Sequence, residues 1–93
     1  MKSIDTKVRS ESGLHARPAA DFARTAADFT STVRIENLSR AGSPVDARSL
    51  IALLTAGVEK GHVVRIVANG PDEDEAVEAL RAILAGQPET VAE

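Results

Sequence analysis

The chain has no cysteine, tryptophan or tyrosine, and its only aromatic residues are Phe22 and Phe29. Without cysteine, disulfide bonds and thiolate metal ligands are excluded, which fits a reducing cellular compartment. Two phenylalanines offer little surface on which nucleic-acid bases could stack. The composition therefore excludes a disulfide-stapled scaffold and argues against recognition of single-stranded nucleic acid.

Long apolar runs are also missing, since the longest uninterrupted one covers residues 50–54. A transmembrane helix needs about 20 mostly apolar residues. The start of the chain, Met1 and Lys2, leads into an alternating segment rather than the apolar core of a signal peptide. We therefore predict a soluble cytoplasmic protein that does not insert into membranes.

The eleven lysines and arginines are scattered, and the net charge is −3. This distribution gives no electrostatic footprint for nucleic acid, which we exclude as a partner. Ninety-three residues provide one hydrophobic core,. We predict a single domain over residues 1–86, a mobile tail over 87–93 and a monomeric protein.

Hydrophobic periodicity predicts four strands and three helices. The strands are expected at residues 3–9, 32–36, 43–46 and 63–68, and the helices at 16–28, at 50–56 and from about 72 to the glycine at 86. Strands that alternate with one-sided helices favour an α+β fold with a β-α-β-β-α-β-α order. We predict a two-layer open-faced sandwich, in which three helices cover one face of a four-stranded antiparallel sheet and water covers the other.

His15 lies between the first predicted strand and the first predicted helix, so we expect it at or beside the N-terminus of that helix,. Free N–H groups and the helix dipole attract anions there. A phosphoryl group on the imidazole would meet the N–H groups of Ala16 and Arg17, the Arg17 charge and the Ser12 hydroxyl. The same field favours neutral, nucleophilic imidazole. Gly13 is expected to give the loop freedom to present the ring.

A lone histidine at a helix start is more often a simple capping or surface residue, and the residues alone leave that interpretation open for His15. His62 receives only that interpretation, because no further ligand residue stands at metal-binding spacing from it,. Neither histidine predicts a metal site, and no nucleophile elbow or phosphate-binding Gly-Lys-Ser/Thr loop is present. We predict no cofactor and no metal.

Two motifs favour a functional role for His15 over a simple capping or surface role. Residues 12–19, with the sequence Ser-Gly-Leu-His-Ala-Arg-Pro-Ala, resemble the active-site segment of HPr, the histidine-containing phosphocarrier family of the bacterial phosphoenolpyruvate:sugar phosphotransferase system. Residues 48–51 and 57–61 are similar to the family's second helix and the turn after it. Residues 2–86 can be laid along the family with three extra residues near 40–43.

The resemblance implies a phosphocarrier rather than an enzyme, with His15 and Arg17 as its catalytic residues. Enzyme I, which uses phosphoenolpyruvate, would phosphorylate Nδ1 of His15, and the chain would donate the group to IIA domains of sugar permeases. Ser12, Ala16 and Arg17 would bind the phosphate. The family's partner-docking surface falls on Ala20, Arg24, Leu50, Ile51 and Leu54, although core packing is an equally good interpretation of Ile51 and Leu54.

Ser49 aligns with the serine that a dedicated HPr kinase phosphorylates in low-GC Gram-positive relatives, so this kinase and transcription regulators are further partners that the resemblance implies. The physical alternative is that Ser49 is only a helix N-cap, which contributes about 1 kcal/mol. We favour the N-cap, because the longer hairpin and residues 87–91 resemble HPr of high-GC Gram-positive bacteria, where that kinase is usually missing.

Some positions depart from the family pattern. Ala20 stands where members often carry a hydroxyl, and Ala27 and Asp28 stand where some carry basic residues, which predicts different partner electrostatics. Three other functions compete with this one: an HPr-like carrier in a regulatory or dihydroxyacetone-kinase branch, an interaction domain without phosphotransfer, and a hydrolase. The presence of His15 argues against the second, and the lack of a nucleophile–base pair argues against the third.

Overall fold

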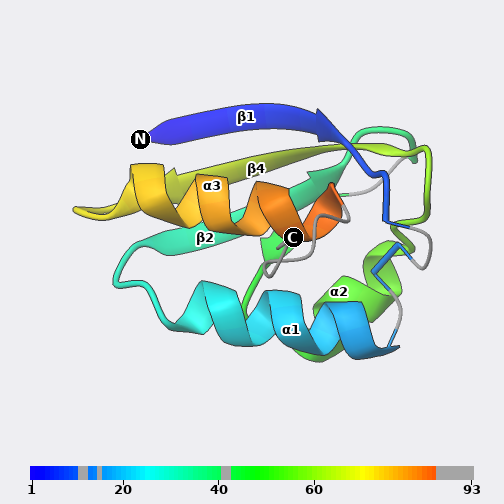
Figure 1. The fold of residues 1–93 in the computed structure, drawn as a ribbon, viewed down its shortest axis with the longest axis horizontal. Helices are drawn as coiled ribbons and strands as arrows, with labels where there is room; N and C mark the ends of the chain where they lie inside the picture. Colours follow the sequence, from blue (N-terminus) through cyan, green and yellow to red (C-terminus); the bar gives the residue numbers. More distant parts are fainter. Residues whose placement is uncertain (11–12, 15, 41–42, 86–93) are drawn as a thin grey trace, which may run out of the picture.

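Seven elements follow one another in the predicted β-α-β-β-α-β-α order (Figure 1). The structure is a computed structural model and describes residues 1–10, 13–14, 16–40 and 43–85. The predicted tail over 87–93 lies outside this range. The elements are β1 (Lys2–Lys7), α1 (Ala16–Ala27), β2 (Thr32–Asn37), β3 (Val45–Asp46), α2 (Leu50–Ala56), β4 (Val63–Asn69) and α3 (Glu73–Leu84).

Two strands are shorter than their sequence patterns. The predicted first strand reaches residue 9, but β1 stops at Lys7. The N–H of Val8 still donates to the carbonyl of His62, which lies opposite it in register, whereas the N–H of Arg9 leaves the sheet and donates to the carbonyl of Leu84. The predicted third strand began at residue 43, but β3 begins at Val45, directly after a proline that has no N–H to give to a ladder,.

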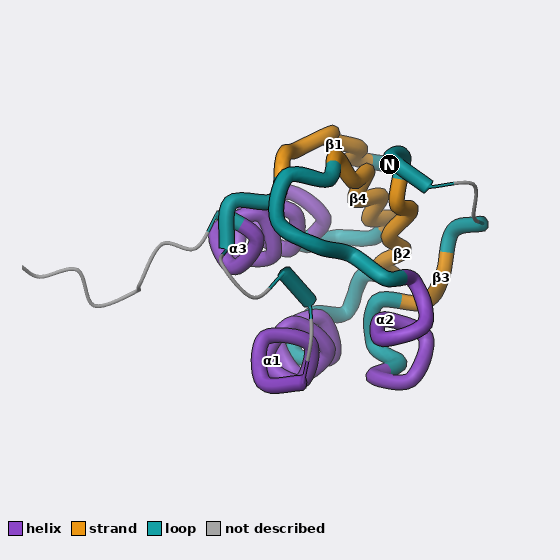
Figure 2. The backbone as a smooth tube through the Cα atoms, turned by 90° about the vertical axis from the view of Figure 1, so that its right-hand side faces the viewer, coloured by secondary structure: helices purple, strands orange, loops and turns teal. Residues whose placement is uncertain are grey.

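The sheet is antiparallel throughout, with the strand order β1-β4-β2-β3. Figure 2 shows the strands on one side of the molecule and α1, α2 and α3 together on the other, which confirms the predicted two-layer sandwich. Strand β4 is central, since it pairs with both β1 and β2. The register places Ile4, Ile66 and Ile35 side by side on the helix-covered face.

The opposite face of the sheet is charged. Asp5, Arg65 and Glu36 form the neighbouring cross-strand row, and Arg65 donates two hydrogen bonds to Asp5 at 2.7 and 3.1 Å. Exposed ion pairs of this kind contribute little to stability, because water and salt screen them. The two rows together show the alternation expected of a sheet with one buried and one solvated face.

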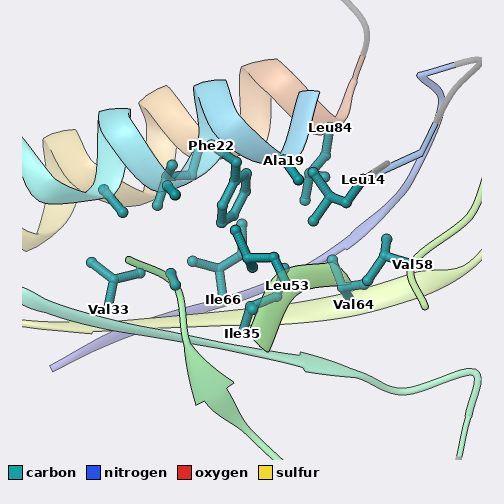
Figure 3. Packing of buried hydrophobic residues seen from close by; sticks show 14 of the residues in the cluster. Leu14, Ala19, Phe22, Val33, Ile35, Leu53, Val58, Val64, Ile66 and Leu84 are labelled. Carbon is teal, nitrogen blue, oxygen red and sulfur yellow. The ribbon is translucent and has the colours of Figure 1, made fainter. Parts of the chain in front are cut away.

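The core lies between the sheet and the helices, and the apolar positions predicted for α1 and α3 point into it (Figure 3). Phe22 of α1 is fully buried at its centre, against side chains from the inner face of the sheet. In both helices the apolar residues that recur at helical spacing face the core. Ala19, Phe22, Ala23 and Ala26 in α1 are buried, as are Ala76, Val77, Leu80 and Leu84 in α3, whereas Ile83, which the spacing also assigns to the α3 stripe, is only partly buried.

A carboxylate joins the start of α3 to the turn before β2. Asp72 accepts hydrogen bonds from the backbone N–H groups of Thr30 and Ser31, both at 2.9 Å, and from both hydroxyls. The Ser31 hydroxyl, followed by the Thr30 N–H, lowers the pKa of Asp72 from 3.8 to about 2. Donors that bind the charged carboxylate favour its ionised form, so the contact is strongest above the ordinary aspartate pKa.

Gly13 is required by its backbone conformation and by a close approach. Its φ is +58°, and a Cβ atom there would lie 2.5 Å from the carbonyl oxygen of Val58 and 2.7 Å from Cα of Glu59. The sequence predicts conformational freedom at this glycine; its positive φ is a conformation that such freedom allows, and the close approach is a second reason for glycine. Gly13 lets two segments of backbone pack together, which no side chain would permit.

We expect the Asp72 contact to stabilise the fold in a pH-dependent way. Because the folded-state pKa is depressed, its contribution should be complete above about pH 4 and should be lost as the pH falls through about 2. The free energies of unfolding of the wild type and of Asp72→Asn, measured with urea, should therefore differ clearly at pH 7 and become nearly equal near pH 2.

Asp74→Asn serves as the matched control, because Asp74 is an exposed carboxylate on the same helix that pairs only loosely with Lys2, at 3.8 Å. A difference between wild type and Asp72→Asn that is the same at both pH values would contradict the assignment.

Gly13→Ala should destabilise the fold more than Gly61→Ala does. Both glycines have positive φ, and an alanine in such a conformation costs about 1–2 kcal/mol,. Only Gly13→Ala adds overlap with backbone atoms, since a Cβ at Gly61 would meet nothing within 4 Å. Chemical denaturation of the two variants measures the difference, and equal losses would show that the close approach is unimportant.

Candidate functional site

Helix α1 begins at Ala16, the position at which the sequence predicts the helix that follows His15. His15 and Ser12 lie outside the described residues, so their predicted roles, and phosphate binding by Ala16, remain predictions. Pro18 falls in the first turn of α1, where its missing N–H removes no helical hydrogen bond,.

Burial and backbone hydrogen bonds fix the two residues immediately before His15 in the sequence. Leu14 is only 1% exposed, and Figure 3 shows its side chain in the core near Ala19 and Leu84. Its N–H donates to the carbonyl of Val58 at 3.0 Å, and the N–H of Gly13 donates to Ser10 at 3.1 Å. The backbone that leads to position 15 is thus anchored to the loop between α2 and β4.

Arg17 lies in the first turn of α1 and is exposed. Within the described part of the chain, its guanidinium has no hydrogen bond or ion pair with another residue. A planar group with five N–H donors is therefore available to pair with oxygens of a phosphoryl group. This arrangement agrees with the predicted role of Arg17, although no ligand tests it.

Three apolar side chains of α2 face solvent, and we call them the α2 patch: Leu50, Ile51 and Leu54. They are 40%, 76% and 45% exposed. The core-packing interpretation of Ile51 and Leu54 is therefore wrong, and Leu53 is the residue of α2 that enters the core.

The two predicted docking residues on α1 are exposed as well. Helices α1 and α2 pack against each other (Figure 2), so Ala20 and Arg24 belong to the same helical layer as the α2 patch. Arg24 pairs with Asp21 at 2.9 Å on the surface of its own helix. The predicted docking residues thus all lie on exposed parts of two neighbouring helices.

Ser49 is the N-cap of α2, as predicted. Its hydroxyl accepts a hydrogen bond from the N–H of Ala52 at 3.2 Å, and Gly57 ends the helix with φ of +65°. The cap explains the presence of a serine at this position. Phosphorylation of Ser49 remains a prediction.

Sequence reasoning missed two polar residues that organise the loop after α2. Asn37 is only 4% exposed, and its amide group contacts the carbonyls of Ala56 and Gly57 and the ring of His62. His62, for which the sequence predicts only a capping or surface role, is half-buried and accepts the N–H of Glu59. No periodicity or motif marks these two positions, because their contact joins residues 25 apart in sequence.

No group of three or more histidine, acidic or cysteine residues able to hold a metal ion occurs among the residues described. A search of the same residues for a helix long and apolar enough to span a membrane also found none.

Comparison with known proteins gives a consistent picture. Residues 2–86 match the family model described as the PTS HPr component phosphorylation site. The phosphocarrier protein HPr of Vibrio cholerae is 41% identical over 84 residues, which cover 90% of this chain and 95% of that protein. A crystal structure of HPr from Thermoanaerobacter tengcongensis is 36% identical, with a TM-score of 0.83 over 95% of this chain and 99% of that one.

A second group of relatives is much longer. The multiphosphoryl transfer protein of Haemophilus influenzae is 42% identical over 85 residues, which cover 90% of this chain but 17% of that protein. The chain therefore spans less than a fifth of the length of this relative.

The predicted origin in a high-GC Gram-positive bacterium is not supported, because the sequence relatives come from Gram-negative bacteria. The predicted resemblance to the HPr family is confirmed. With its fold and these matches in agreement, the chain belongs to the HPr family of phosphocarriers of the phosphotransferase system.

Proposed function

We propose that this chain carries a phosphoryl group on His15 between two cytoplasmic proteins: it takes the group from phosphoenolpyruvate through enzyme I and gives it to IIA domains of sugar permeases. The observation that carries this proposal is the exposed α2 patch beside a helix whose first turn presents Arg17. A carrier must dock on its donor and its acceptor in turn, so it needs an apolar surface that both partners can cover.

Carrier chemistry also explains the choice of a histidine. A neutral imidazole nitrogen can attack phosphorus, so the bond to Nδ1 forms while the bond from phosphorus to the donor breaks. The reverse exchange with an acceptor protein regenerates the free ring. The helix that begins at Ala16 would contribute N–H groups toward the phosphoryl oxygens, and Arg17 would contribute charge-assisted hydrogen bonds,.

The α2 patch has the properties of a docking surface. Monomeric proteins rarely leave several large aliphatic side chains exposed together without a function. Truncation of a residue near the centre of an interface commonly costs more than about 1 kcal/mol of binding free energy. Ile51, which is 76% exposed, is the patch residue with most surface to lose on docking.

The central test is phosphorylation by phosphoenolpyruvate and enzyme I, followed by intact mass spectrometry. The wild type should gain one phosphoryl group that is labile in acid and stable in alkali, as expected for a bond from nitrogen to phosphorus. His15→Ala should gain none, and a phosphorylated His15→Ala protein would overturn the proposal.

Arg17→Ala should slow the same transfer at least about tenfold, because a hydrogen bond to a charged group contributes about 1.5–3 kcal/mol. Its melting temperature should stay close to that of the wild type, since Arg17 has no partner among the described residues. A large drop in melting temperature with normal transfer would make Arg17 a structural residue instead.

Ile51→Ala should raise the KM of enzyme I for this chain about fivefold, which corresponds to about 1 kcal/mol of lost docking energy. Leu38→Ala is the matched control, because Leu38 is an exposed aliphatic residue, 39% accessible, that belongs to neither docking helix. Steady-state kinetics with both variants measure the effect. The same KM for the two variants would show that the α2 patch does not contact enzyme I.

A further inference from the structure

The loop between α2 and β4, residues 57–62, contacts both the end of β1 and the segment before His15, and we call it the α2–β4 loop. It meets the end of β1, because the N–H of Gly61 donates to the carbonyl of Val8 at 2.8 Å. It meets the segment before His15, because the carbonyl of Val58 accepts the N–H of Leu14. Gly13 packs against its backbone so closely that a Cβ atom would overlap Val58. The position of this loop therefore determines where Gly13 and Leu14 lie.

His62 holds the loop from within. Its Nδ1 atom lies 3.2 Å from the backbone nitrogen of Glu59, and the N–H of Glu59 donates to it. The backbone N–H of His62 donates to the carbonyl of Glu59 at 3.0 Å. Two hydrogen bonds in opposite directions thus close the turn between these residues, directly after Val58.

Asn37 fixes the role of the His62 ring. The Oδ1 atom of Asn37 accepts the N–H of Ser39 at 3.0 Å, so its Nδ2 group is the one that faces Ala56, Gly57 and His62. Nδ2 lies 3.1 Å from Nδ1 of His62. Because two N–H donors converge on Nδ1, that atom must be the acceptor, and the proton of the neutral ring resides on Nε2.

We infer that His62, oriented by Asn37, is a positioning residue for phosphoryl transfer: it acts through the α2–β4 loop on Gly13 and Leu14, and so on the backbone that presents His15. The inference rests on the proposed transfer at His15. In this role His62 acts through the loop and not by direct contact with the phosphoryl group. Without an acceptor at Nδ1, the N–H groups of Glu59 and Asn37 lose their common partner, and the loop loses its defined distance from Leu14.

The effect should appear in the rate of transfer rather than in docking. The α2 patch and the exposed part of α1 form the proposed docking surface, and His62 belongs to neither helix. Reacting groups must be aligned closely, and a displacement of about 1 Å can cost up to about a hundredfold in rate. Loss of the His62 acceptor should therefore lower kcat while leaving KM close to the wild-type value.

The test compares His62→Leu, which removes the acceptor, with His62→Asn, which can place an oxygen near the position of Nδ1. Both variants are assayed as phosphoryl acceptors from enzyme I, with their folding followed by circular dichroism. We expect His62→Leu to lose about tenfold in kcat with little change in KM, and His62→Asn to recover most of that loss. If His62→Leu proves too unstable, His62→Phe removes the acceptor while keeping a ring in the site.

A nitrogen-15 NMR spectrum of the wild-type ring provides an independent readout, because it should show a protonated Nε2 and an unprotonated Nδ1. The opposite tautomer would overturn the inference, as would equal kinetic losses in His62→Leu and His62→Asn, or a wild-type kcat in His62→Leu. These outcomes leave the proposed function intact if the wild type still accepts phosphate. A wild-type chain that accepts none would overturn both.

Discussion

The contact between Gly13 and the backbone of Val58 is the constraint on which the site depends. It brings the end of the β1–α1 connection against the α2–β4 loop at a distance that only glycine permits,. The neighbouring hydrogen bond from Leu14 to Val58 fixes the direction of the chain, and the burial of Leu14 ties that direction to the core. The segment that continues to His15 therefore starts from a rigid base, although it belongs to a loop.

Most of the fold was accessible from the sequence because hydrophobic periodicity reports which face of an element is buried. The alternation around Val33 and Ile35 and the helical spacing around Phe22 and Leu80 each identified an inner face, and the structure buries all four,. Strand ends were less accessible. They depend on where a backbone N–H finds a partner outside the sheet, as that of Arg9 does at the carbonyl of Leu84.

The polar contacts between distant segments could not be predicted. Asp72 binds Ser31 across 41 residues, and Asn37 binds His62 across 25. A single sequence shows that such residues are polar, but their partners follow from the topology of the sheet, which brings the end of β2 beside the start of β4. The same limit explains why the sequence does not show the contacts of His62 with Asn37 and Glu59 or the close approach at Gly13.

Residues 50–54 show a different ambiguity, because five successive apolar residues carry no helical face that could separate core from surface. Only Leu53 is buried, and Leu50, Ile51 and Leu54 are left exposed. For a soluble domain this exposure lowers solubility without adding to the core. Periodicity gives no reason for these three exposed apolar side chains. The resemblance to HPr does, because it predicts that partner proteins dock on them.

Helix α2 contributes to both proposed activities, docking and phosphoryl transfer. It presents the α2 patch, and it leads directly into the loop that anchors Leu14. A helix of seven residues is too short to be stable alone, so its geometry must come from its ends and from packing,. Ser49 caps its first turn, Gly57 ends it, and Asn37 binds the carbonyls of Ala56 and Gly57. Since Asn37 also contacts His62, one buried amide sets both the end of the docking helix and the start of the loop beside the acceptor segment. Docking and transfer therefore share a structural support, and a change at Asn37 should affect both at once, whereas a change at His62 should affect the loop alone.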